Sequence, residues 1–159
     1  MFSQPRLVSR IRASVLCQRD TPISTAWQAI GWWEARRAAF NLIVGSAGIV
    51  SSLVVGVIGL GSYFLFGSDF GVPDPPLFAV LAVLIYAIMA NVCYTGGWIA
   101  ELVIRKAWPE QADRFAALSL ALGVLFAVLL TLSPGVLVGA VGLFGLFGHL
   151  LGVVRSGNN

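Results

Sequence analysis

Four long runs of apolar residues constrain the fold of this chain more than any other feature. The first, from about residue 40 to 66, contains no charged residue, and the others cover about 77–99, 115–132 and 136–154. A helix rises about 1.5 Å per residue, so about 20 apolar residues cross the hydrocarbon core of a bilayer. Only 11% of the residues are charged, whereas a soluble domain has about 25%. The sequence therefore predicts an integral membrane protein.

The number of spans depends on a short interruption between the last two runs. Only Ser133, Pro134 and Gly135 separate them. Together the two runs cover about 40 residues, or about 60 Å as a helix, which is twice the thickness of the hydrocarbon core. Pro and Gly are typical of a tight turn. We therefore predict an all-α fold, an integral membrane four-helix bundle. Three spans plus a re-entrant hairpin are the alternative.

Basic residues predict the orientation of the spans. They are Arg6, Arg10, Arg12, Arg19, Arg36, Arg37, Arg105, Lys106, Arg114 and Arg155. The loop at 67–76 holds Asp69 and Asp74 and no basic residue. In a four-span arrangement all ten basic residues lie on one side, and Lys and Arg in short loops mark the cytoplasmic side. Both termini are therefore predicted to be cytoplasmic, whereas three spans would place Arg155 opposite the other nine.

This pattern divides the chain into three parts. We predict a basic cytoplasmic tail at 1–24, a membrane domain at 25–154 and a short cytoplasmic tail at 155–159. Residues 1–19 contain four arginines and no acidic residue, and Arg-rich, Ser-rich N-terminal segments are also typical of mitochondrial presequences. A bacterial inner (plasma) membrane and a mitochondrial inner membrane therefore both remain open at this point.

An interfacial helix is predicted before the first span. Trp27, Trp32 and Trp33 are amphipathic rings of the kind that favour the lipid headgroup region. Arg36 and Arg37 follow them and have side chains long enough to extend to lipid phosphates. We expect this segment to anchor the chain to membrane lipids.

Small residues recur at intervals of three and four along the first span. They are Gly45, Gly48, Ser52, Gly56 and Gly59. Such a face lets helix backbones approach closely, and packing of this kind drives helix association in lipid. The sequence therefore predicts that this face contacts another membrane protein or a second copy of the chain.

Polar residues are concentrated in the predicted cytoplasmic half of the bundle. The candidate polar cluster comprises Arg36, Arg37, Asn41, Asn91, Tyr94, Thr95, Trp98, Glu101, Ser119 and His149. Asn91, Tyr94 and Glu101 fall on one helical face, and Arg105 follows Glu101 by one turn in the order that favours an ion pair. Polar groups within a membrane turn inward and find partners, so a network inside the bundle is expected.

Two interpretations of this network remain open. In the first, Glu101 pairs with a neighbouring arginine and the amides fix the register of the helices. In the second, the cluster lines a cavity open to the cytoplasm that binds a solute or passes protons. Glu101 and His149 would then titrate, as histidine does near neutral pH in general.

An enzymatic activity is not predicted. The chain has one histidine, and Cys17 and Cys93 lack the spacing of a metal site. We expect Cys93 to be buried among apolar neighbours. No nucleophile-elbow, Walker or zinc-protease motif is present, so no catalytic, cofactor-binding or metal-binding residue is assigned. The basic residues lie at membrane borders rather than in a stripe with aromatics, so no nucleic-acid partner is expected.

Two runs, WWEARRAAFN at 32–41 and ANVCYTGGWIAEL at 90–102, resemble an uncharacterised family of small bacterial multi-pass membrane proteins. The resemblance covers the first two spans and implies a bacterial inner membrane, without implying an activity. From the small-residue face of the first span we expect a structural or accessory subunit that packs against partner helices. The alternative is a small-solute or proton-coupled transporter with a cytoplasm-facing polar cavity.

Overall fold

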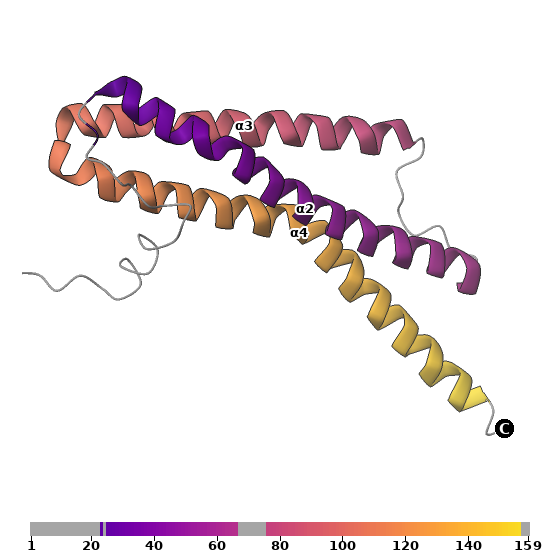
Figure 1. Cartoon of the computed structure of the whole chain (residues 1–159). Helices are drawn as coiled ribbons and strands as arrows, with labels where there is room; N and C mark the ends of the chain where they lie inside the picture. Colours follow the sequence, from indigo (N-terminus) through magenta and orange to yellow (C-terminus); the bar gives the residue numbers. More distant parts are fainter. Residues whose placement is uncertain (1–22, 24, 67–75, 157–159) are drawn as a thin grey trace, which may run out of the picture. The chain divides into compact units, whose positions relative to one another are not determined.

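Three long α-helices form the described part of the chain (Figure 1). In this computed structural model the described residues are 23, 25–66 and 76–156. The helices are α2 (Ala26–Phe66), α3 (Pro76–Ala107) and α4 (Pro109–Ser156). The predicted tail at 1–24 lies outside the described residues except for Ile23.

Each helix contains a segment that is long and apolar enough to cross a membrane. These segments are Ala26–Phe64, Val80–Ala107 and Pro109–Gly145. Large apolar side chains such as Leu42 and Phe126 are exposed along the helices. So much apolar surface is unfavourable in water, but it is favourable in contact with lipid or with other helices. The helical class expected from the sequence is confirmed, and the composition of the helices agrees with an integral membrane protein.

The predicted turn between a third and a fourth span is not present. The runs at 115–132 and 136–154 belong to the single helix α4, and Pro134 lies inside it. The predicted count of four helices is therefore not confirmed. Proline lacks the N–H that would bond to the carbonyl of Leu130, but the Ser133 hydroxyl donates to that carbonyl at 2.8 Å. A local side-chain bond thus compensates for the missing one and lets the helix continue.

The interfacial helix predicted at the start of the membrane domain is also continuous with the first span. Thr25 and Gln28 form a capping box, in which each backbone N–H donates to the other residue's side-chain oxygen, at 3.2 and 3.3 Å. The helix begins directly after Thr25 and contains no proline up to Phe66. Nothing in the sequence therefore ends the helix between the tryptophans and the apolar run.

A single residue joins α3 to α4. The N–H of Trp108 donates to the carbonyl of Ile104, and the carbonyl of Trp108 accepts from Gln111. Pro109 opens α4, a position where its missing N–H costs nothing. Arg105 and Lys106 lie in the last turn of α3, where cations interact favourably with the helix dipole.

The chain packs as two compact units. Unit 1 contains the residues up to Val44 together with Val83–Val128, and unit 2 contains Gly45–Ala82 and Leu129–Asn159. The core of unit 1 is formed by Trp33, Phe40, Val44, Tyr94, Ala116, Ala117, Leu120 and Ala127. Small alanines on α4 face larger aromatic side chains on α2 and α3, so the surfaces interlock.

Unit 2 is built on a close approach of α2 and α4. The N–H of Gly135 donates to Oγ of Ser51 at 3.0 Å. A Cβ added at Gly135 would lie 3.0 Å from the Cα and 3.2 Å from the carbonyl oxygen of Ser51. Only glycine leaves room for this contact, and the same residue that favoured a turn in the sequence therefore serves as a helix-packing residue.

The small-residue face predicted on α2 is offset from its buried face. Val44, Ala47 and Ser51 are buried, whereas Gly45 and Ser52 are exposed, Gly48 and Gly56 are half-buried and Gly59 is buried. A shift of one residue rotates a helical face by about 100°. Much of the predicted face is thus left uncovered within the described chain.

Candidate functional site: a buried ion pair and its neighbours

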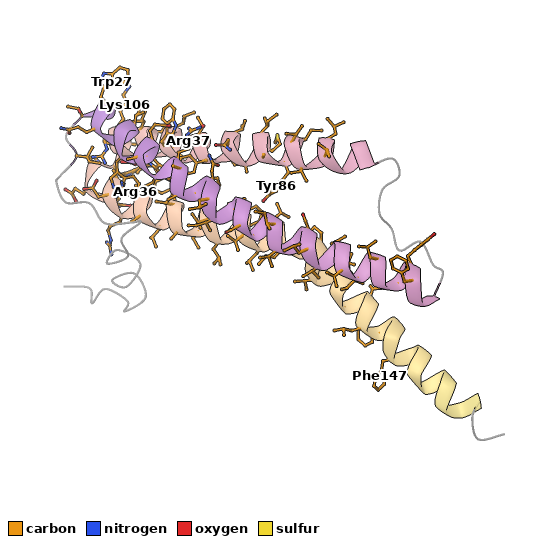
Figure 2. All side chains as sticks on the ribbon, turned by 45° about the vertical axis from the view of Figure 1, so that its right-hand side comes forward. Trp27, Arg36, Arg37, Tyr86, Lys106 and Phe147 are labelled. Carbon is orange, nitrogen blue, oxygen red and sulfur yellow. The ribbon has the colours of Figure 1, made fainter. Side chains whose placement is uncertain are left out.

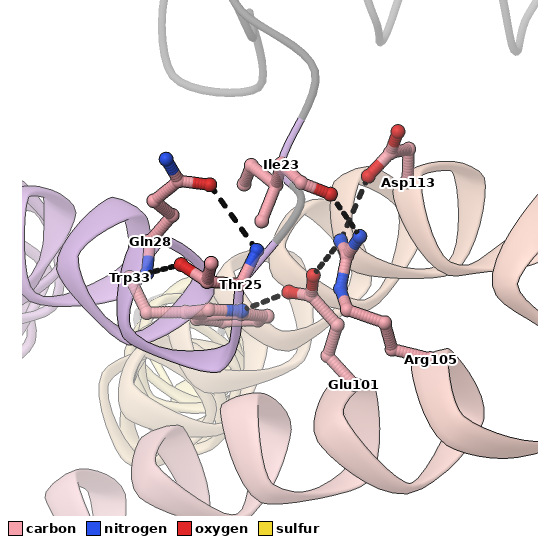
Figure 3. A network of polar contacts seen from close by, with 7 residues as sticks. All are labelled: Ile23, Thr25, Gln28, Trp33, Glu101, Arg105 and Asp113. Atoms are coloured by element: carbon pink, nitrogen blue, oxygen red, sulfur yellow. Dashed lines mark hydrogen bonds and ion pairs between the residues drawn. The ribbon is translucent and has the colours of Figure 1, made fainter.

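Among the residues of unit 1 that the structure describes, Glu101 is the most deeply buried charged one, with 0% of its surface exposed. Nε1 of Trp33 on α2 donates to Oε2 of Glu101 at 2.6 Å, and Nη2 of Arg105 donates to Oε1 at 2.6 Å (Figure 3). Both carboxylate oxygens therefore have a donor. A buried carboxylate requires such partners, since an uncompensated charge away from water is very costly.

Arg105 extends this contact to two further parts of the chain. Its Nη2 also lies 2.8 Å from Oδ1 of Asp113 on α4, and its Nη1 donates to the carbonyl of Ile23 at 2.7 Å (Figure 3). One guanidinium thus connects α3, α4 and the segment before α2. The ion pair between Glu101 and Arg105 is the one expected from their spacing.

Trp33 is held in place from two sides. The Tyr94 hydroxyl donates to the carbonyl of Trp33, and the two rings pack edge to face with their centroids 5.3 Å apart. A Cβ added at Gly97 would lie 3.0 Å from the indole ring. Glycine at this position therefore leaves the space that the indole occupies beside Glu101.

A second group of polar contacts joins α2 and α3. Nη2 of Arg37 donates to Oγ1 of Thr95 at 3.0 Å and to Oε1 of Glu34 at 2.8 Å. Nδ2 of Asn91 donates to Oδ1 of Asn41 at 3.1 Å. The Arg37–Thr95 and Asn91–Asn41 bonds connect the two helices at successive levels, and they fix the register of α2 against α3.

The remaining members of the predicted cluster lie outside these two groups. Arg36 stacks on Trp32, with its guanidinium carbon 4.1 Å from the ring centroid. Trp98 is half-buried against the core, and its Nε1 has no hydrogen-bond partner among the residues that the structure describes. Ser119 is half-buried on α4 and takes part in neither group. The side chain of His149 lies outside the described residues.

The basic and aromatic residues of the predicted interface share one end of unit 1. Figure 2 shows Trp27, Arg36, Arg37 and Lys106 at the end where α3 joins α4, and Tyr86 further along α3. Trp27 is 82% exposed, as expected for a ring in the headgroup region. Trp33, which was expected beside it, is 1% exposed.

An open groove of about 700 Å³ lies beside the second group. Its lining residues are Arg37, Leu84, Ala87, Ile88, Asn91, Val92, Thr95, Gly96 and Ile99. Glu101 is not among them. The groove therefore differs from the predicted polar cavity, because the carboxylate expected to line that cavity is enclosed by Trp33 and Arg105.

Arg105 was outside the candidate cluster but was expected to pair with Glu101, whereas no part in the ion-pair network was expected for Trp33 and Asp113. Trp33 was interpreted as an interfacial ring, although Trp33, Phe40 and Val44 recur at helical spacing on one face, which indicates a buried stripe. Asp113 follows Arg105 across a short connection that contains Pro109, a typical helix start. An ion pair between Asp113 in the first turns of α4 and Arg105 at the end of α3 could thus have been predicted from the sequence.

Nothing in the described residues resembles a metal centre. No group of three or more His, Cys, Asp or Glu side chains comes together there. Cys93 is exposed, so the expectation that it is buried among apolar neighbours is wrong. Comparisons of the chain with protein-family models, curated proteins and solved structures find no match.

Proposed function

We propose that this protein is a structural or accessory subunit of a membrane assembly. The observation that carries this proposal is the complete enclosure of Glu101, whose two oxygens accept from Trp33 and Arg105. A carboxylate that moved protons or bound a solute would need access to water at some stage. Here the charged group is used to hold three segments of the chain together, as expected of a scaffold.

The uncovered small residues of α2 support a role for partner helices. Gly45 is exposed, and a Cβ added there or at Gly56 would meet nothing within 4 Å. Ser52 is also exposed. A face of this kind allows another helix to approach closely in lipid. A second copy of this chain or another membrane protein is therefore the proposed partner.

The length of α4 gives a further reason to expect a partner. The helix contains 48 residues, about 72 Å at the helical rise, against about 30 Å of hydrocarbon. Tilting absorbs part of such an excess. Exposed side chains near its end, such as Phe144 and Phe147, are available for contact with a partner helix.

The orientation follows from the basic residues. We place the N-terminal end of α2 and the α3–α4 junction on the cytoplasmic side of a bacterial inner membrane. Nine of the ten basic residues lie before or near the start of α2 or near this junction, and basic residues mark the cytoplasmic side. If α4 crosses once, the C-terminus lies on the opposite side. Reporter fusions after residues 71 and 159 should then both be located outside, and a cytoplasmic reporter at 159 would restore the four-span arrangement.

Co-purification tests the proposed function directly. Material from the source membrane, extracted in mild detergent, should contain a stoichiometric companion or a homo-oligomer by native mass spectrometry. Gly45→Leu and Ser52→Leu should release it, because bulky side chains would separate the helices. Gly123→Leu is the matched control, since Gly123 is exposed on α4 and a Cβ there meets nothing within 4 Å.

Two results would contradict this proposal. One is a bare monomer from the unaltered chain. The other is equal loss of the companion in all three variants, which would show that the α2 face has no special part in the association.

A further inference from the structure

The groove of unit 1 follows one face of α3. Its α3 residues recur at intervals of three and four from Leu84 to Ile99, which is the spacing of a single helical face. Arg37 is the one lining residue from α2. The groove therefore runs along α3 and is open on its outer side, and the cationic side chain of Arg37 lines it from α2.

The chemistry of the lining changes along the groove. Leu84, Ile88 and Val92 are apolar and exposed. Arg37, Asn91 and Thr95 provide the polar groups, all in the other half of the groove, which also contains Gly96 and Ile99. A ligand that complements both parts has an apolar chain and an anionic polar head.

The donors of Arg37 are only partly used by the protein. Nη2 forms an ion pair with Glu34 and donates to Thr95, Nε is buried without a hydrogen-bond partner among the described residues, and 30% of the side chain stays exposed. Hydrocarbon cannot satisfy the exposed part of such a guanidinium. A phosphate oxygen can, and guanidinium groups bind phosphate through charge-assisted hydrogen bonds.

The dimensions of the groove agree with one leaflet of a bilayer. From Leu84 to Thr95 the helix advances 11 residues, about 16 Å, and one leaflet contributes about 15 Å of hydrocarbon. Arg37 directly precedes the charge-free run that begins at about residue 40. A lipid with its phosphate at Arg37 would therefore extend its acyl chain to about the bilayer midplane at Leu84.

We propose that this groove is a binding site for one anionic phospholipid. Arg37 holds the phosphate, Thr95 and Asn91 line the glycerol region, and the apolar face of α3 from Leu84 to Val92 holds an acyl chain. The site does not depend on the accessory role proposed above, because it uses only residues of unit 1.

The test uses the full chain in detergent, with phosphatidylglycerol and phosphatidylcholine added in equal amounts, and native mass spectrometry to count retained lipids. One phosphatidylglycerol should be retained in preference to phosphatidylcholine. Arg37→Gln should weaken its retention about tenfold, as expected for loss of a charge-assisted contact. Arg37→Lys should recover only part of it, since lysine lacks the planar fork.

Two matched controls separate the groove from its surroundings. Arg36→Gln removes the same charge from the neighbouring residue, which stacks on Trp32 and does not line the groove, and it should change retention less than Arg37→Gln. Ala87→Trp should fill the groove and block retention. Val83→Trp places the same ring on an exposed α3 position outside the groove and should leave retention unchanged.

Three results would overturn the proposal. Equal retention of the two lipids would show that the headgroup charge is not recognised. An equal effect of Arg36→Gln and Arg37→Gln would show a general attraction to the basic end of the protein. A change from dimer to monomer in Ala87→Trp, with unaltered lipid retention, would show that a second copy occupies the groove.

Discussion

Unit 1 holds α2 against α3 and unit 2 holds α2 against α4, and the two units do so with different chemistry. In unit 1 the contacts include a buried ion pair, an indole N–H and packed aromatic rings. In unit 2 the helices meet through Ser51 and Gly135, with a backbone N–H as the donor. Large polar side chains make the contacts of unit 1, and small residues with a direct backbone contact replace them in the charge-free stretch of unit 2.

The contrast has a physical basis. A charge costs less near the interface than at the centre of the bilayer, so unit 1 can use Glu101 and Arg105 as a connection. Away from the border the remaining means of association are packing and weak hydrogen bonds between close backbones. Substitutions should therefore have the largest effects in unit 1 and smaller effects, sensitive to side-chain volume, in unit 2.

Arg105→Gln should produce the largest loss of stability. It leaves Glu101 buried without its cation, and breaking a buried pair in this way costs about 3–5 kcal/mol of unfolding free energy. Reversible unfolding in mixed micelles measures the change. Adding Glu101→Gln to this variant should recover part of the loss, because the uncompensated charge is removed.

The matched control for Arg105 is Arg114→Gln. Arg114 is an exposed basic residue near the start of α4, next to Asp113, which contacts Arg105. Its replacement should change the unfolding free energy by about 0.5 kcal/mol or less. Similar losses in the two arginine variants would contradict a special role for the buried pair.

Trp33→Phe should have the next largest effect. Phenylalanine keeps an aromatic ring beside Tyr94 but removes the Nε1–H donor to Glu101, and a hydrogen bond to a charged group contributes about 1.5–3 kcal/mol. Trp27→Phe is the control, because Trp27 is 82% exposed. An equal response of the two tryptophans in the same unfolding measurement would assign Trp33 to the interface rather than the network.

Gly135→Ala should test the packing of unit 2. The added methyl would lie 2.9–3.2 Å from atoms of Ser51, and overpacking of this kind costs about 1–3 kcal/mol. Gly123→Ala on the same helix has open space at its Cβ and should be stabilising, because alanine favours a helix over glycine. The two variants should thus shift the unfolding transition in opposite directions, and a shared direction would contradict the close approach.

The helical class, the apolar spans and the ion pair could be predicted from the sequence because each depends on local information. The length of a charge-free run can be compared directly with the thickness of the hydrocarbon core. Glu101 and Arg105 lie one helical turn apart, so their contact follows from their spacing in the sequence. The contacts of Arg37 with Thr95 and of Asn41 with Asn91 also agree with the shared depth expected of the polar cluster.

The parts that were missed depend on which face of a helix is covered. Cys93 lies in an apolar stretch, but hydropathy alone does not say whether a residue faces the core or lipid. Trp33 has the amphipathic ring of an interfacial residue, and only the position of Glu101 on another helix makes it a buried donor. The offset between the glycines of α2 and its buried face has the same origin. A shift of one residue along the helix turns the face by about 100°, so the shifted residues face a different neighbour.

Pro134 was interpreted as part of a turn because proline and glycine are the strongest local signals for one. Two serines far from each other in the sequence alter the outcome. Ser133 satisfies the Leu130 carbonyl and Ser51 accepts from Gly135. A helix that contains proline can persist in a membrane when such groups satisfy the freed backbone.

The smallest predicted effect follows from this arrangement and concerns Ser133. Ser133→Ala should cost about 0.5–1.5 kcal/mol of unfolding free energy, the net worth of one hydrogen bond. In a Pro134→Ala background residue 134 regains its N–H for the Leu130 carbonyl, so the same serine substitution should then be nearly neutral. A double-mutant cycle measures this coupling.

Pro134→Ala alone should stabilise the protein, because proline is unfavourable inside a helix. If the chain instead turned at 133–135, as four spans would require, the proline would favour the turn and its replacement would destabilise the protein. The sign of the Pro134→Ala effect therefore decides between one continuous α4 and two separate spans.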